Sequence, residues 1–198
     1  RNVFIVERPP KHLQGLTDDP RDPVVRVGQS FLLRCSEVLT INDTGTMLDN
    51  PLYLSSTKKN ERTATRQTNR QSVFMSEKLV ADAVWQTLRP SQGRKGAVQR
   101  FLSEGSPLGV DTDCLLIHRQ TNTYLSTDPG KAERTEFGVE FEAYTDRETQ
   151  PGKLGLMVAE FKGECTAKTL QKPDAPKYAW SFVAAVADPE PGDASGSI

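Results

Sequence analysis

The chain has 198 residues, a length that fits one domain and is short for two. Hydrophobic residues make up 36% of the sequence, so a modest core is expected beneath much surface and loop. The 25 basic and 26 acidic residues nearly cancel, which disfavours a general nucleic-acid-binding protein, and no apolar run approaches the roughly 18 residues of a membrane-spanning helix.

The chain begins with a strand-like segment at residues 1–6 and without an initiator Met, from which we expect that it is cut from a longer protein. After a Pro-rich loop at residues 8–23 come two groups of four short apolar segments, each bounded by Gly, Pro, Asn or Asp, a pattern typical of β-strands. The first group comprises residues 27–35, 52–56, 73–75 and 84–88. The second group comprises residues 110–118, 123–127, 139–141 and 179–183.

The two groups repeat one order of strands, since each has a Tyr-Leu-Ser segment in second place and ends on a Trp-containing strand. Paired residues are offset by 83, 71, 66 and 95 positions, so the loops vary while the order is kept. Such units favour a β-trefoil, in which three of them close into a barrel with a hairpin cap. Phe4 would match Trp85 and Trp180 as part of a preceding unit, whose remainder we expect upstream of Arg1, because two units alone would expose strand edges.

We therefore expect one all-β domain over residues 1–186, with complete units at about 24–88 and 108–186, and a flexible Pro/Gly/Ser-rich tail at 187–198. Short helices are expected at residues 76–83, with Ser76 as N-cap, and at 97–103, with Val98, Phe101 and Leu102 on one face. An insertion at residues 150–177, absent from the first unit, is expected to contain a hairpin over 153–170.

Charge is distributed unevenly along the chain. Residues 58–100 carry a net charge of +7, whereas the residues that follow carry −7. Within the basic region, residues 58–71 contain a single apolar side chain, Ala64, so this stretch cannot bury a face and is expected to be a long loop. Such a loop is either a solvated surface or an electrostatic contact for an acidic partner. The candidate contact residues are Lys58, Lys59, Arg62, Arg66, Arg70, Arg94 and Lys95.

The sequence contains no recognisable catalytic constellation, so we expect neither enzyme activity nor a cofactor or metal. His118 and Cys114 would lie on one strand face about 13 Å apart, with no further ligands at metal spacing. The segment at residues 93–96 lacks the glycine spacing of a phosphate-binding loop. Three cysteines at wide spacings favour free thiols in a reducing compartment.

Several residues with chemical potential are expected to be structural. Cys35 and Cys114 fall in matching strands and are predicted to be unpaired and shielded in the core. Trp85 and Trp180 are likewise predicted to be core residues because their places in the repeat match. The alternating carboxylates Glu140 and Glu142 are predicted to lie on a solvated strand face.

Several short motifs occur in a characteristic order. They are Arg-Asn-Val-Phe-Ile at residues 1–5, Val-Gly-Gln-Ser-Phe at 27–31, Leu-Tyr-Leu-Ser-Ser at 52–56, Cys-Leu-Leu-Ile-His at 114–118, and the closing Trp180. Together they resemble the family of cilia- and flagella-associated protein 161, over roughly residues 1–57, 72–145 and 178–186. The Pro-rich loop and the 150–177 insertion depart from that family. The wider resemblance is to the MIR-type β-trefoils of inositol trisphosphate receptors and protein O-mannosyltransferases.

The resemblance implies a non-enzymatic microtubule inner protein, which binds the luminal wall of axonemal doublet microtubules and stabilises them for ciliary or flagellar motility. Its implied partners are α/β-tubulin and other microtubule inner proteins, in the cytoplasmic cytoskeleton of the cilium, without nucleic acid, membrane or small-molecule substrate. Tubulin is acidic, so residues 58–100 are the expected contact. Two alternatives remain open: a MIR-type module of a larger protein that binds a sugar or inositol phosphate, and an enzyme of unknown type.

Overall fold

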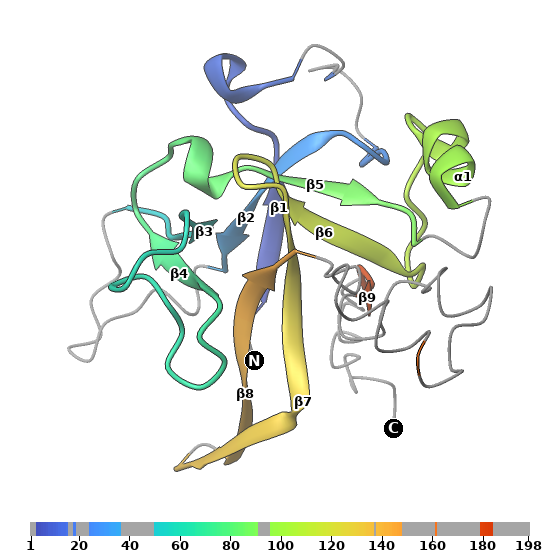
Figure 1. Cartoon of the computed structure of the whole chain (residues 1–198). Coiled ribbons are helices and arrows are strands. Elements are labelled where there is room, and N and C mark those ends of the chain that lie inside the picture. Colours follow the sequence, from blue (N-terminus) through green and yellow to red (C-terminus); the bar gives the residue numbers. More distant parts are fainter. Residues whose placement is uncertain are drawn as a thin grey trace, which may run out of the picture.

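The computed structural model describes residues 3–15, 18, 24–36, 50–90, 96–136, 138–147, 161 and 179–183, and strands dominate this part of the chain (Figure 1). The strands are β1 (Phe4–Glu7), β2 (Ser30–Cys35), β3 (Tyr53–Ser56), β4 (Gln71–Ser76), β5 (Trp85–Leu88), β6 (Cys114–His118), β7 (Thr123–Thr135), β8 (Gly138–Asp146) and β9 (Ala179–Trp180). The helices are η1 (Lys11–Leu13), η3 (Ala81–Ala83) and α1 (Gly96–Ser103).

Seven strands close into a ring. They pair in the order β2-β3-β4-β8-β7-β6-β5, and β5 pairs back with β2. β1 joins this ring at β2 and β9 joins it at β6, and every pairing is antiparallel. The predicted all-β class is therefore confirmed.

The two predicted units have the same internal pairing. In the first unit β2 pairs with β3 and β5, and β3 pairs with β4. In the second unit β6 pairs with β7 and β9, and β7 pairs with β8. The pairing between successive units is repeated as well. Phe4 of β1 pairs with Cys35 in the first strand of the first unit. Trp85, in the last strand of the first unit, pairs in the same way with His118 in the first strand of the second unit. This connectivity is that of two β-trefoil units preceded by one strand, β1, which is equivalent to the last strand of a unit. It confirms that Phe4 and Trp85 hold equivalent positions.

The closing tryptophans also make equivalent contacts. The indole N–H of Trp85 donates to the Leu54 carbonyl at 2.8 Å. The indole N–H of Trp180 donates to the Leu125 carbonyl at 2.9 Å. The two acceptors hold the same place in their units, which confirms the predicted equivalence. Trp85 is fully buried, and Trp180 is partly buried and packs against the core cluster that contains Trp85. The prediction of core tryptophans is thus confirmed for Trp85 and in part for Trp180.

The predicted match between the third strands is wrong by four residues. Val73 opposes Ser56, and Ala143 opposes Thr127, so the offset is 70 and not 66. The segment 139–141 instead lies on the outer half of the long β7–β8 hairpin, which extends beyond the body of the molecule (Figure 1). Alternating sequences along both strands are compatible with several registers, and only pairing with the neighbouring strand selects one.

One of two clusters of buried side chains in the described residues contains members of both units. Its members are Phe31, Leu33, Trp85, Cys114, Leu116 and Leu125. Cys114 is buried and Cys35 is half-buried, and both are free thiols. The prediction that both would be shielded is therefore wrong for Cys35, because the strand beside it, β1, is itself only partly buried.

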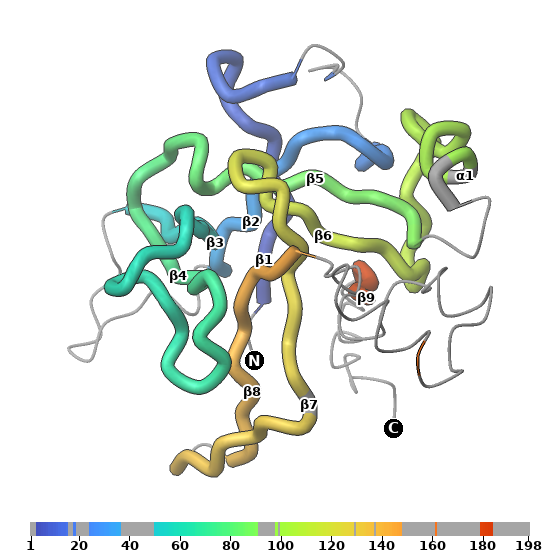
Figure 2. Tube along the Cα trace, viewed as in Figure 1, coloured from blue at the N-terminus to red at the C-terminus, as the bar shows by residue number. Residues whose placement is uncertain are grey.

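The helices differ in part from those predicted. α1 matches the expected helix at 97–103, but Val98, Phe101 and Leu102 are exposed on it. Figure 2 shows that the helix forms part of the connection between β5 and β6. The helix predicted at 76–83 is reduced to η3. The Ser76 hydroxyl accepts a hydrogen bond from the Lys78 N–H at 3.1 Å, which is a turn and not an N-cap. The predicted hairpin at 153–170 and the tail at 187–198 lie outside the described residues, apart from Phe161.

Candidate functional site

The predicted basic loop is an ordered excursion between β3 and β4. Ala64 forms a β-bridge with Gln71, and the Ser72 N–H donates to the Thr63 carbonyl at 3.0 Å. The Thr65 N–H donates to the Arg70 carbonyl at 2.9 Å. Two short segments of the loop thus run back along each other. The expectation that this polar stretch is a loop is confirmed, and the backbone pairing explains how it keeps a shape without burying an apolar face.

An asparagine turn fixes the first half of the loop. The Asn60 side-chain oxygen accepts hydrogen bonds from the backbone N–H groups of Arg62 and Thr63, both at 2.9 Å. The Thr63 hydroxyl in turn accepts from the Asn60 N–H at 2.8 Å. Such side-chain-to-backbone bonds replace the backbone bonds that a strand or helix would supply.

Glu142 of β8 holds the tip of the loop. Its carboxylate accepts hydrogen bonds from the N–H groups of Gln67, at 3.2 Å, and Thr68, at 3.0 Å. Burial raises the pKa of Glu142, but these hydrogen bonds lower it by more, so the pKa lies below its usual value. The expectation of a solvated face is thus wrong for Glu142, which is half-buried, while Glu140 is exposed. Glu142 is half-buried because it contacts Gln67 and Thr68, which precede it by more than 70 residues in the sequence.

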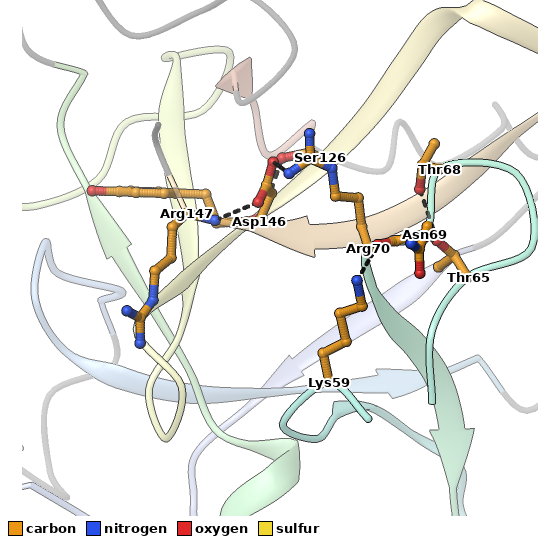
Figure 3. Close-up of polar contacts among 9 residues, drawn as sticks. Lys59, Thr65, Thr68, Asn69, Arg70, Ser126, Asp146 and Arg147 are labelled. Atoms are coloured by element: carbon orange, nitrogen blue, oxygen red, sulfur yellow. Dashed lines mark hydrogen bonds and ion pairs between the residues drawn. The ribbon is translucent and has the colours of Figure 1, made fainter. Parts of the chain in front are cut away.

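Arg70 anchors the end of the loop through an ion pair. Its guanidinium lies 2.9 Å from a carboxylate oxygen of Asp146, the last residue of β8 (Figure 3). The other Asp146 oxygen accepts from the Arg147 N–H at 2.9 Å. The Lys59 ammonium donates to the Asn69 carbonyl at 2.6 Å, which joins the two sides of the loop.

The structure brings five of the seven predicted contact residues onto this one loop. All five are exposed, but Lys59 and Arg70 are engaged within the protein. The other three, Lys58, Arg62 and Arg66, make no side-chain hydrogen bond or ion pair within the described part of the chain. We call these three the free cations. Arg94 and Lys95, predicted to belong to the same surface, lie outside the described residues.

A polar cavity of about 700 Å³ opens beside the base of the loop. Lys58, Lys59 and Arg147 place three cations around it, and Asp82 contributes one carboxylate. The remaining lining residues are Thr57, Asn60, Gln71, Gln120, Thr121 and Thr123. The sequence analysis did not identify this cavity, because its walls come from the β3–β4 loop, η3 and the β6–β7 turn.

A hydrogen-bonded network lies behind this cavity. The Gln71 amide donates to the hydroxyls of Ser56, at 2.8 Å, and Thr121, at 3.0 Å. The ring nitrogens of His118 contact the Asp82 carbonyl at 2.9 Å and the Thr121 hydroxyl at 2.7 Å. Since a carbonyl only accepts, Nε2 carries a proton. Burial lowers the pKa of His118 and so favours the neutral imidazole, in which Nδ1 accepts from the Thr121 hydroxyl.

Two buried groups with chemical potential, Cys114 and His118, are in unreactive surroundings. Burial raises the pKa of the Cys114 thiol to about 11, so the thiol stays protonated and is a poor nucleophile. Burial lowers the pKa of His118, and both of its ring nitrogens are engaged. Within the described ranges, no three His, Cys, Asp or Glu side chains gather closely enough to hold a metal ion. In the same ranges, no helix has the length and apolar character needed to cross a membrane.

Comparison with known proteins gave likenesses among solved structures. No family model matches the chain, and no curated protein matches it. Among solved structures, the crystal structure of the SDF2-like protein from Arabidopsis thaliana is similar, with a TM-score of 0.48 and 17% sequence identity. The match covers 74% of this chain but only 64% of that protein, less than two thirds of its length. The fold assignment rests on the strand pairing described above.

Proposed function

We propose that this protein is a structural microtubule inner protein that binds the luminal wall of axonemal doublet microtubules, together with tubulin and neighbouring inner proteins. The proposal joins the family resemblance of the sequence to one structural observation. That observation is the internally hydrogen-bonded loop at residues 58–70, which presents the free cations to solvent. In this proposal the protein acts without catalysis, in the cytoskeleton of the cilium or flagellum.

The ordering of the loop is what suits it to an attachment role. Fixing flexible side chains and backbone on binding costs free energy, and a loop already held by Asn60, Arg70 and Glu142 avoids much of that cost. Single exposed ion pairs contribute only about 0–1 kcal/mol, so attachment requires several cations acting together. An acidic surface such as that of tubulin would contact the three free cations simultaneously, and salt would weaken this contact by screening the charges.

The test compares two triple variants of a tagged protein in ciliated cells. The first carries Lys58→Ser, Arg62→Ser and Arg66→Ser, which remove the free cations and no internal contact. The matched control carries Lys11→Ser, Lys78→Ser and Arg134→Ser, which remove three exposed cations elsewhere. Both variants lower the net charge equally. Retention in detergent-extracted axonemes is measured over a salt series.

We expect the first variant to be released at lower salt than the unmodified protein, and the control to behave like the unmodified protein. Equal release of all three proteins would show that the loop is only a solvated surface. Recovery of the unmodified protein in soluble or membrane fractions would contradict the proposed location altogether.

A second candidate function is a MIR-type module that binds a sugar or an inositol phosphate. The observation that favours it is the polar cavity, which is lined by Lys58, Lys59 and Arg147 together with hydroxyl and amide groups. Calorimetric titration with glycans and inositol phosphates distinguishes the candidates. Binding that is lost in Lys58→Ser and Arg147→Ser together would support the module, whereas absence of heat with every ligand would exclude it.

A further inference from the structure

The basic loop contains a threonine in a sequence context that protein kinases recognise. Arg62 precedes Thr65 by three residues, and many serine/threonine kinases bind an arginine at this position through carboxylates of their substrate cleft. The same spacing occurs at one other place in the chain, where Arg100 precedes Ser103. The spacing by itself therefore offers two candidate hydroxyls.

The backbone conformation distinguishes these two hydroxyls. Ser103 is the last residue of α1, and its hydroxyl donates to the Arg100 carbonyl at 2.9 Å. Thr65 instead follows Ala64, which is in a β-bridge, and its N–H donates to the Arg70 carbonyl. Kinases bind their substrates as extended chains, so the backbone around Thr65 is the better suited. Because Ala64 is the one apolar residue of the loop, separating this segment from β4 exposes little apolar surface.

The Thr65 side chain belongs to a polar cluster at the tip of the loop. Its hydroxyl lies 2.7 Å from the Thr68 hydroxyl and accepts from the Arg70 N–H at 2.9 Å (Figure 3). The Glu142 carboxylate, which accepts the Gln67 and Thr68 N–H groups, is within hydrogen-bonding reach of both hydroxyls. A phosphoryl group on Thr65 carries a charge of about −1.5 to −2 at neutral pH. Repulsion from Glu142 would then separate the tip of the loop from β8.

A phosphate at this position also changes the charge that the loop presents. Residues 58–70 contain five cations and one carboxylate, Glu61, so one phosphate removes about half of the net charge of +4. Arg62 and Arg66 lie close to Thr65 in the sequence and form charge-assisted hydrogen bonds with a phosphate readily. Two of the three free cations are thereby withdrawn from an external partner.

We propose that Thr65 is a phosphorylation site, modified by a serine/threonine kinase that recognises Arg62. The kinase transfers the γ-phosphoryl group of ATP to the Thr65 hydroxyl oxygen. The bond from the γ-phosphorus to the bridging oxygen breaks, the new P–O bond forms, and the hydroxyl proton and ADP are released. The phosphate detaches the tip of the loop from Glu142 and weakens the electrostatic contact with the partner. The weakened contact rests on the proposed function, whereas the modification and the detachment do not.

The modification is tested on the purified full chain with ATP and a calmodulin-dependent protein kinase that requires arginine three residues before its target. Mass spectrometry gives the modified sites and their initial rates. We expect phosphorylation at Thr65 to be at least tenfold faster than at Ser103. Arg62→Ser should lower the rate at Thr65 at least tenfold, whereas the matched control Arg66→Ser should leave it within threefold. A rate at Ser103 equal to that at Thr65, or a rate at Thr65 that does not depend on Arg62, would overturn the proposal.

The detachment is tested by hydrogen exchange of the phosphorylated and the unphosphorylated chain. We expect exchange at residues 66–69 to become at least tenfold faster on phosphorylation, and exchange in β5 and β6 to stay the same. Unaltered exchange at 66–69 would overturn the detachment.

Retention in axonemes then tests the weakened contact, and the phosphorylated protein should be released at lower salt. Equal release of both forms would overturn regulation through Thr65. Failure of the unphosphorylated protein to be retained at any salt would overturn the proposed function and the regulation that depends on it. The modification and the detachment, measured on the purified chain, would still stand.

Discussion

His118 couples the folded state to pH. Burial disfavours the imidazolium ion and lowers its pKa below the ordinary value of 6.5, although the hydrogen bond to the Asp82 carbonyl opposes this. As pH falls through 6.5, the unfolded chain therefore binds a proton before the folded chain does. Stability from neutral His118 is complete above pH 6.5 and declines below it.

The two histidines of the chain provide a matched test of this dependence. We expect the free energy of unfolding of the unmodified protein and of His12→Gln, in which an exposed residue is changed, to decline between pH 6.5 and pH 5. His118→Gln should be less stable, but its free energy of unfolding should lack the decline caused by protonation of His118. Urea unfolding at a series of pH values measures this free energy. An unchanged dependence on pH in His118→Gln would show that His118 is not the source of the decline.

Trp85 and Trp180 make equivalent hydrogen bonds, but Trp85 is more deeply buried. Comparing their Phe variants therefore shows how burial changes the free-energy cost of losing the bond. Trp85→Phe should lower the free energy of unfolding by about 1–3 kcal/mol, because it leaves the Leu54 carbonyl without its donor beneath a buried ring. Trp180→Phe should cost roughly 1 kcal/mol or less, because water reaches this partly exposed site. Urea denaturation followed by circular dichroism compares the two, and equal costs would contradict this account.

At the scale of elements, the shape of the basic loop depends on one carboxylate of a neighbouring strand. Gln67 and Thr68 donate to different oxygens of the Glu142 carboxylate, so Glu142→Gln should remove one of the two hydrogen bonds and weaken the other, because an amide has a single acceptor oxygen, which is poorer than a carboxylate oxygen. We expect faster hydrogen exchange in the loop and little change in β5 and β6. Glu140→Gln, at an exposed position of the same strand, is the control and should change neither. Unaltered loop exchange in Glu142→Gln would mean that the Asn60 turn and Arg70 suffice.

At the scale of the whole molecule, the shared strand β5 should make the two units unfold together. Because β5 pairs with both β2 and β6, neither unit can open without breaking a pairing of the other. Leu33→Ala and Leu116→Ala change equivalent buried residues, and each should cost about 2–5 kcal/mol. Tryptophan fluorescence and circular dichroism should report one coincident transition in each variant. Two separated transitions would show that the units are independent.

The sequence by itself determined the features that depend on local pattern. Short alternating segments and their order predicted the all-β class, the two units and the equivalence of Phe4 with Trp85, since strand periodicity and the repeat are visible without any partner. The absence of apolar residues around Ala64 predicted an exposed basic loop for the same reason. The structure places five of the seven candidate contact residues on this loop, and their role in contacting a partner stays a prediction.

Only the tertiary structure decided the features that depend on distant partners. The register of the third strand differs by four residues from the expected one. A shift by an even number of residues leaves each side chain on the same face of the sheet, so the alternation of hydrophobic residues cannot distinguish the two registers. Glu142 binds a loop more than 70 residues away, Cys35 is partly exposed beside β1, and the apolar residues of α1 face solvent. Burial and polar contacts of this kind depend on which distant segments pack against each other. The local sequence does not specify that packing.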